Sequence, residues 1–360
     1  MTYKGTGVDY GAMDPFKLAA QQAAQKTAKN ILRLGLEEVV ESRGESAYVI
    51  RTLDNKYMAH VEEGLGTKNL VADAMYKLTG KPYYDRIAID AVAMIVNDIV
   101  TLGVLPVSVA MHLAVGSSSW FDDKNRYRAL IKGWARACHM ARCTWGGGET
   151  PTLKDIVNPD TAVLAGSAMG IADKLITGNI CHGDAIVIIE SSGIHANGLT
   201  LARKIADKLR KGYLTKLSNG RSYGDTLLDP TTIYVGLVED CMEKGVDIHY
   251  TVNVTGHGWR KLMRSPLPFQ YIIDQLPREL PIFPFLQKHG PVDDIEAYGN
   301  LNMGAGFALY VPENQVSLVI EVAKKLKLSA FCAGHISRGD KKVVIKPKGL
   351  EYLGKTLAVR

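Results

Sequence analysis

Residues 183–209, GDAIVIIESSGIHANGLTLARKIADKL, join an apolar run to an amphipathic segment through a polar turn. The run at 183–189 has strand length and many β-branched residues, whereas 199–209 has helical periodicity and a basic end. Backbone N–H groups at the start of a helix are unpaired and carry partial positive charge, so the turn can hold an anion. His195 lies within that turn and can donate a hydrogen bond or move a proton. The alternative is an ordinary turn with a solvated histidine.

The chain length predicts two domains. A chain of 360 residues exceeds the size at which a single core keeps growing, and 46% hydrophobic residues suffice for two cores. The strand-turn-helix pattern starts afresh near residue 172. We therefore expect an α/β (α+β) protein with an N-terminal domain at 1–171 and a C-terminal domain at 172–360.

Charge and cysteine content argue against several classes of protein. The net charge of +6 is mild, and few Lys/Arg tracts are present, so nucleic-acid binding is not expected. The five cysteines are odd in number and lack C-x-x-C spacing, which is typical of reduced thiols. Neither a signal segment nor an apolar run of membrane length is found. We expect a soluble, cytoplasmic protein that binds no membrane.

The first half reads as alternating helices and strands separated by glycine-rich turns. We expect helices at 16–34, 85–102 and 124–142, with the first beginning at Asp14 and Pro15, and strands at 47–53, 56–62, 105–116 and 161–173. The glycine-rich segment 143–150, CTWGGGET, is expected to be a turn.

The helix expected at 85–102 carries polar residues among apolar ones. On a helical wheel Asp90 and Asn97 fall about 20° apart, and Asp98 about 80° from Asp90, so the three share one side. Carboxylates beside a core are costly unless a cation or several donors receive them. Either an internal salt bridge or helix-end cap, or a metal ion held for a phosphate-bearing ligand, would satisfy them.

Two further acidic loops lie in the same half. Glu62 and Glu63 open the loop EEGLGTK, and Glu149 follows three glycines. Carboxylates on such loops suit Mg²⁺, which keeps several positions for water and phosphate, and Lys68 could reach the same phosphates. Neither loop is a Walker A motif, and the glycine run at Glu149 could also be an ordinary tight turn.

Together these segments resemble the aminoimidazole ribonucleotide synthetase family, phosphoribosylformylglycinamidine cyclo-ligase. The matching pieces run from residue 3 to about residue 337 and keep the family's order. They are YKGTGVDYGA, GLGTK, IDAVAMIVNDIVTLGVLPV, GGGET, SSGIHANGLTLARK, VTGHG, NMGAGFALYV and AGHIS.

The resemblance implies two α/β domains, with the N-terminal sheets of two subunits pairing into a barrel across a homodimer and a mixed C-terminal sheet with helices. It implies that formylglycinamidine ribonucleotide and ATP give aminoimidazole ribonucleotide, ADP and phosphate. It also implies roles for single residues: Asp98, Glu63 and Glu149 hold Mg²⁺ with Asn97 in support; Lys4, Asp9, Gly64, Gly66, Thr67, Lys68, Gly147 and Gly148 contact ATP; His195 and Asn197 face the substrate.

The chain departs from the family pattern at two places. Where the family has DGVGTK, this chain has Glu63 in place of the aspartate and Leu65 in place of the valine. Of the family's GGETAEMPG, this chain keeps only the part as far as Glu149. Two other functions therefore stay open. One is a related kinase or dikinase acting on thiamine phosphate or selenide, and the other is a noncatalytic nucleotide-binding paralogue.

Overall fold

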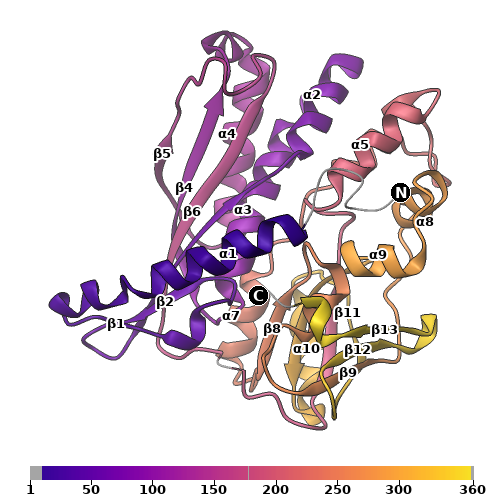
Figure 1. Ribbon diagram of the computed structural model, residues 1–360. Coiled ribbons are helices and arrows are strands. Elements are labelled where there is room, and N and C mark those ends of the chain that lie inside the picture. The colour runs from indigo at the N-terminus through magenta and orange to yellow at the C-terminus, as the bar shows by residue number, and fades with distance from the viewer. Residues whose placement is uncertain (1–9, 177, 358–360) are drawn as a thin grey trace.

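Two sheets, each covered by helices, organise the chain in the computed structural model (Figure 1). The structure describes residues 10–176 and 178–357, so the expected ATP contacts Lys4 and Asp9 lie outside the described residues. One sheet is formed by residues 37–172 and the other by residues 185–353. The expected two-domain mixed α/β architecture is confirmed.

The N-terminal sheet is mixed and open on one face. Its six strands lie in the order β1 (Glu37–Glu38), β2 (Tyr48–Arg51), β3 (Tyr57–Gly64), β6 (Ala162–Ala172), β4 (Leu105–Val115) and β5 (Thr144–Glu149). Neighbours are antiparallel except β4 and β5. Helices α2 (Lys68–Thr79), α3 (Tyr84–Val100) and α4 (Lys124–Met140) lie on one side of this sheet (Figure 1). Val107, Val163, Met169 and Ile171 are exposed on its strands.

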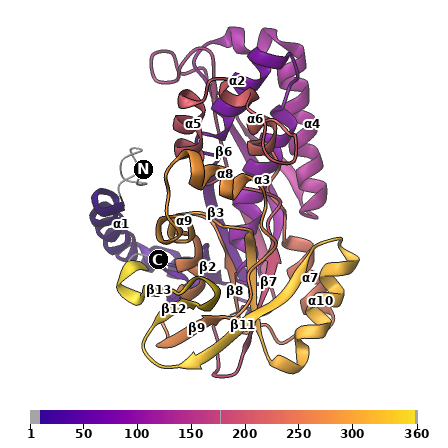
Figure 2. The ribbon, with the colours of Figure 1, turned by 90° about the vertical axis from the view of Figure 1, so that its right-hand side faces the viewer.

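The C-terminal sheet is built around an apolar central strand. Its order is β13 (Leu350–Leu353), β12 (Lys342–Ile345), β9 (Phe269–Ile273), β11 (Ala330–Arg338), β7 (Ala185–Glu190), β10 (Ala305–Val311) and β8 (Tyr250–Asn253). The helices of this half are α5 (Leu199–Lys208), α6 (Tyr223–Leu227), α7 (Val235–Glu243), α8 (Ile282–His289), α9 (Asp294–Asn300) and α10 (Val316–Lys325), as Figure 2 shows from the side. Every residue of β10 is buried, and β7 is buried up to its last residue. The expected strand and helix on either side of the histidine turn are thus β7 and α5.

Two expected elements differ in the structure. The segment expected to be a glycine-rich turn is strand β5, which pairs in parallel with β4. Its glycines permit close strand contact, because a Cβ on Gly148 would stand 2.0 Å from the carbonyl oxygen of Met111. The first helix, α1 (Tyr10–Gln25), begins before Pro15, and a separate 3₁₀ helix follows at Ala28–Leu34. None of the helices in the described ranges is long and apolar enough to cross a membrane.

Candidate active site

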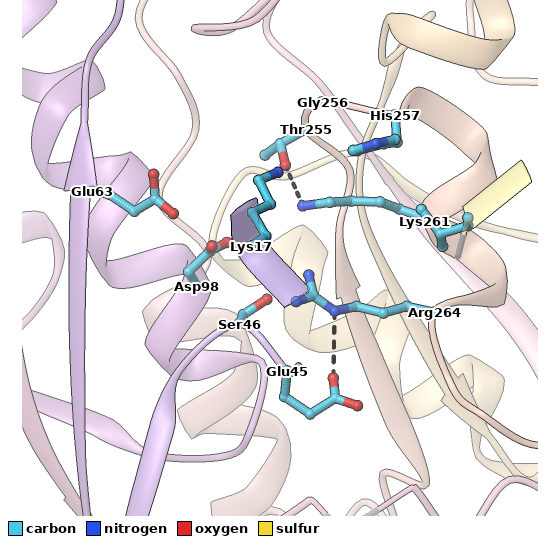
Figure 3. Close-up of a pocket in the computed structure, with 11 residues that line it drawn as sticks. Lys17, Glu45, Ser46, Glu63, Asp98, Thr255, Gly256, His257, Lys261 and Arg264 are labelled. Atoms are coloured by element: carbon cyan, nitrogen blue, oxygen red, sulfur yellow. Dashed lines mark hydrogen bonds and ion pairs between the residues drawn. The ribbon is translucent and has the colours of Figure 1, made fainter. Parts of the chain in front are cut away.

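A cavity of about 250 Å³ lies where the two domains meet. The N-terminal domain contributes the carboxylates of Glu63, at the end of β3, and Asp98, near the end of α3. The C-terminal domain contributes Lys261 and Arg264 from the segment after β8. Figure 3 shows the acids on one side of this cavity and the cations on the other. The arrangement can therefore bind a cation and an anion together.

The two carboxylates share one partly enclosed site. Asn253 Nδ2 donates to Asp98 Oδ1 at 2.6 Å, which positions that side chain. Burial, together with the nearby charge of Asp98, raises the pKa of Glu63 to about 7. A divalent cation between the two carboxylates would relieve the repulsion that Glu63 meets, and oxygen-only donors suit Mg²⁺. The expected pairing of Glu63 with Asp98 is thus compatible with a magnesium ion.

The basic side of the cavity was not anticipated from the sequence. Lys261 Nζ donates to Thr255 Oγ1, and burial lowers the pKa of Lys261 to about 8 although Asp98 raises it. Arg264 donates to the carbonyl of Gly44 at 2.9 Å and forms an ion pair with Glu45 at 3.5 Å. The available signal was the basic segment WRKLMR directly after the glycine turn VTGHG.

Lys68 does not line this cavity, so its expected phosphate contact stays a prediction. Its ammonium donates to Asp90 Oδ1 at 2.8 Å and to the carbonyls of His195 at 3.0 Å and Asp229 at 2.8 Å. Both charged side chains of the Lys68–Asp90 pair are fully buried. All three protons of the ammonium are donated in these hydrogen bonds, which join the two domains. Lys68 therefore stabilises the domain interface.

Asn97 also makes hydrogen bonds across the domain interface, and its expected supporting role at the metal ion stays a prediction. Its Nδ2 donates to the carbonyl of Thr232 at 2.8 Å, and its Oδ1 accepts from the N–H of Tyr234 at 2.8 Å. Of the three polar residues on this side of α3, Asp90 is thus held by an internal salt bridge and Asn97 by hydrogen bonds across the interface. Asp98 is the one that lines the cavity.

His195 is buried in the histidine turn rather than solvated. It adopts a left-handed backbone with φ 60°, and its Nε2 accepts from the N–H of Ser192 at 3.3 Å. The neutral ring therefore carries its proton on Nδ1. That atom and Asn197 Nδ2 are buried without a hydrogen-bond partner among the described residues. Two unpaired donors in one turn are costly, and an acceptor oxygen on a ligand would satisfy them.

Burial of His195 predicts a pH effect on stability. Burial, with the charge of Lys68, lowers the pKa of His195 to about 3 from its ordinary 6.5. As the pH falls, His195 takes up its proton in the unfolded chain before it does so in the folded protein. The stability of the folded protein that depends on the neutral ring is therefore complete above pH 6.5 and is lost as the pH falls toward 3. Wild type should lose about 2 kcal/mol more than His195→Asn between pH 6.5 and pH 5, by urea unfolding. Equal losses would contradict the burial, and His139→Asn, at an exposed histidine, is the control.

A second cavity, of about 400 Å³, adjoins the histidine turn. Ser192 and Gly193 of the turn line it, together with Arg221, Asp229 and Arg278. Arg221 donates to both Asp225 and Asp229, with its Nη2 at 2.7 Å from Asp229 Oδ1. This cavity adjoins the Lys68 interface, since Asp229 lines the cavity and its carbonyl accepts from Lys68. It provides polar and cationic groups beside the turn.

The remaining expected ligands divide into two groups. Gly64, Gly66 and Thr67 form the link between Glu63 and α2, whose N-terminus can attract phosphate. Glu149, by contrast, is exposed at the end of β5, and Gly147 and Gly148 lie beside it. The sheet order separates β5 from β3 by two strands, so Glu149 of the same chain does not meet Glu63.

Comparison with known proteins assigns both domains to one family. The N-terminal domain model of AIR synthase related proteins matches residues 44–172, and the C-terminal domain model matches residues 182–346. A T. maritima PurL complexed with ATP shares the fold, with a TM-score of 0.56 at 15% sequence identity over 86% of this chain and 46% of that chain.

Two curated relatives are named phosphoribosylformylglycinamidine cyclo-ligase. The Methanocaldococcus jannaschii protein is 34% identical over 343 residues, covering 93% of this chain and 92% of its own. The Brevibacillus brevis protein is 34% identical over 367 residues, covering 97% of this chain and 99% of its own. Because both domain models match and these relatives align over nearly their whole length, the chain belongs to the phosphoribosylformylglycinamidine cyclo-ligase, or AIR synthase, family.

Proposed function

We propose that this protein converts formylglycinamidine ribonucleotide and ATP into aminoimidazole ribonucleotide, ADP and phosphate. The observation that carries the proposal is the pairing of Glu63 and Asp98 opposite the half-buried Lys261, at positions that fall within the family's matched domains. Carboxylates, an ammonium and a guanidinium in one cavity suit a metal-bound triphosphate.

Phosphoryl transfer explains why the cavity needs charges of both signs. An amide oxygen is a poor leaving group, and transfer of the γ-phosphoryl group to it allows an internal nitrogen to displace it as phosphate. Such transfer depends mainly on positioning and charge neutralisation. Mg²⁺ would supply the neutralisation. Glu63 and Asp98 would hold that ion, while Lys261 and Arg264 would hold phosphate oxygens.

The histidine turn is the proposed substrate side. Its two unpaired donors, His195 Nδ1 and Asn197 Nδ2, would bind an acceptor oxygen of the substrate. The lowered pKa of His195 keeps its ring neutral near pH 7, which favours a hydrogen-bond donor over a proton acceptor. Arg221 and Arg278 in the adjoining cavity would receive an anionic group of the substrate.

A homodimer would bring Glu149 to the metal site, as the family resemblance implies. The side of the N-terminal sheet away from α2, α3 and α4 (Figure 1) supports this proposal. Apolar side chains are exposed on its strands β4 and β6. A second copy packed there would cover this face. Glu149 of the partner subunit would then approach Glu63 and Asp98 from across the barrel.

The dimer proposal predicts the effect of a charge on this face. Met169→Lys should weaken dimerisation about a hundredfold, because a buried ammonium costs several kcal/mol, and should lower turnover in parallel. Sedimentation at a series of concentrations measures this. Ile295→Lys, at an exposed isoleucine of α9, should change neither property. A fully dimeric and active Met169→Lys would contradict the proposed interface.

Release of ADP tests the proposed reaction. Purified protein with Mg²⁺ and ATP should release ADP only when formylglycinamidine ribonucleotide is present, and aminoimidazole ribonucleotide should form in equal amount. Release that instead requires thiamine phosphate or selenide would indicate a related kinase or dikinase. Nucleotide binding without release in any mixture would indicate a noncatalytic paralogue.

The cellular setting follows as part of the same proposal. The five cysteines are free thiols, which suits the reducing cytoplasm, where we place the protein. The domain limits at 171 and 172 also stay a prediction. The strands of the N-terminal sheet end at residue 172, and those of the C-terminal sheet begin at residue 185.

A further inference from the structure

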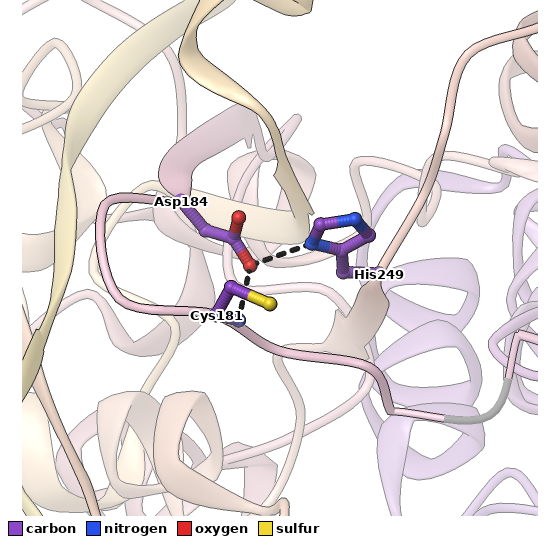
Figure 4. A group of neighbouring side chains, drawn as sticks. All are labelled: Cys181, Asp184 and His249. Carbon is purple, nitrogen blue, oxygen red and sulfur yellow. Dashed lines mark hydrogen bonds and ion pairs between the residues drawn. The ribbon is translucent and has the colours of Figure 1, made fainter.

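Three side chains with different metal-binding atoms meet where the chain enters the C-terminal sheet. Cys181 and Asp184 belong to the turn before β7, and His249 directly precedes β8 (Figure 4). One ligand atom from each lies within 4.8 Å of the others. None of the three lines the cavity of Glu63 and Asp98. His249 and Thr255 of that cavity lie beyond opposite ends of β8, a four-residue strand about 13 Å long.

The backbone holds these residues on rigid elements. The Cys181 N–H donates to Asp184 Oδ2 at 2.7 Å, and the Cys181 carbonyl accepts from the Asp184 N–H at 3.2 Å. These two hydrogen bonds close the turn. The carbonyl of Asp184 accepts from Ile336 N–H, and His249 N–H donates to the carbonyl of Tyr310. Asp184 and His249 are thereby anchored to strands of the same sheet, so their relative position is fixed before any ligand binds.

His249 lies between two carboxylates. Its Nδ1 is 2.8 Å from Asp184 Oδ2, and its Nε2 is 3.2 Å from Asp247 Oδ2. In protein metal sites a ligating histidine commonly donates its second N–H to a carboxylate, which fixes the ring and the tautomer. Asp247 occupies that position if Nδ1 is the ligating atom.

We propose that Cys181, Asp184 and His249 bind a zinc ion. A thiolate, an imidazole and a carboxylate together favour Zn²⁺ over Mg²⁺, which prefers oxygen donors. Tetrahedral zinc needs donor atoms roughly 3.3–3.7 Å apart, so the Asp184–His249 contact would open slightly as the ion replaces the hydrogen bond. Cys181 is exposed, and its Sγ donates to the Asn179 carbonyl at 3.3 Å, so rotation of this side chain can bring the sulfur to the ion. Water would take the fourth position.

Such an ion would tie the segment between the two sheets to the start of β8. The proposal concerns structure and metal affinity, so it stands apart from the cyclo-ligase reaction. The Mg²⁺-dependent activity should therefore stay unchanged in variants of these three residues.

Cobalt substitution tests the site, because a thiolate bound to Co²⁺ gives an intense charge-transfer band that oxygen ligands do not give. Untagged, full-length protein titrated with Co²⁺ should show this band, and Zn²⁺ should abolish it. Cys181→Ser should remove the band, whereas Cys332→Ser, at another exposed cysteine, should keep it. Asp247→Ala should weaken binding about tenfold or more.

Two further measurements distinguish loss of the metal site from a failure of the variant to fold. Zn²⁺ should raise the melting temperature of wild type but not of His249→Ala, and it should protect Cys181 from alkylation as followed by mass spectrometry. The proposal is overturned if no thiolate band appears, if the band survives in Cys181→Ser, or if it is also lost in Cys332→Ser. In those cases the group is a hydrogen-bonded aspartate–histidine pair beside an unrelated thiol.

Discussion

Asp98→Asn should lower kcat/KM for ADP formation by about a hundredfold to a thousandfold while leaving the fold intact. The amide retains an oxygen that can accept the hydrogen bond from Asn253 Nδ2, so the local packing is kept. It removes the negative charge that, with Glu63, would hold Mg²⁺ against the triphosphate. Steady-state assays over a range of Mg²⁺ concentrations measure both the loss and the expected rise in the Mg²⁺ requirement.

A matched substitution separates this effect from a general loss of charge. Asp173→Asn changes an exposed aspartate, which pairs with Lys56 at 3.2 Å at the surface, and should leave activity unchanged. The melting temperature of Asp98→Asn should stay close to that of wild type. Full activity in Asp98→Asn would remove Asp98 from the metal site, and with it the main support for the proposed reaction.

Lys68→Met should destabilise the protein by about 3–5 kcal/mol. The substitution leaves Asp90 buried between the domains, where Thr231 is its only remaining donor among the described residues, from both its N–H and its hydroxyl. Removing one partner of a buried pair leaves the other charge uncompensated, and this costs far more than the pair contributes. Urea unfolding monitored by circular dichroism gives the free energy of unfolding.

Lys77→Met is the matched control, because Lys77 belongs to the same helix but pairs with Asp160 at the surface, at 3.1 Å. An exposed pair contributes about 1 kcal/mol at most. If Lys68→Met instead kept its stability and lost only nucleotide affinity, the phosphate contact expected from the sequence would be correct. The buried Lys68–Asp90 pair would then contribute little to stability. The double variant Lys68→Met with Asp90→Leu should recover part of the lost stability.

Elements defined by their own apolar pattern could be predicted from the sequence. Strand β7 and helices α3 and α5 match expectation because each must bury a continuous run or face, and that need is local. Strand β5 was expected to be a turn, because three successive glycines signal one. Its conformation instead depends on pairing with β4, a partner that the local sequence does not reveal.

The same distinction applies to the site. Glu63 and Asp98 could be predicted because acids among glycines or in an apolar helix need a partner. The partner of Lys68 could not, because Asp90 and the carbonyl of Asp229 are 22 and 161 residues away and only the fold brings them together. Lys261 was missed for a related reason. Its ammonium faces the acids only after the C-terminal domain packs on the N-terminal domain.

Helix α3 carries both Asp90, the acid of the buried ion pair, and Asp98, the carboxylate of the cavity, about two turns or 12 Å apart along the helix. Swinging the domains apart like a hinge would leave Lys68 and Asp90 paired, since both belong to the N-terminal domain, but it would break the hydrogen bonds that they share with His195, Asp229 and Thr231. Because such an opening would leave these buried polar groups without partners, we expect ligands to enter while the two domains stay packed together.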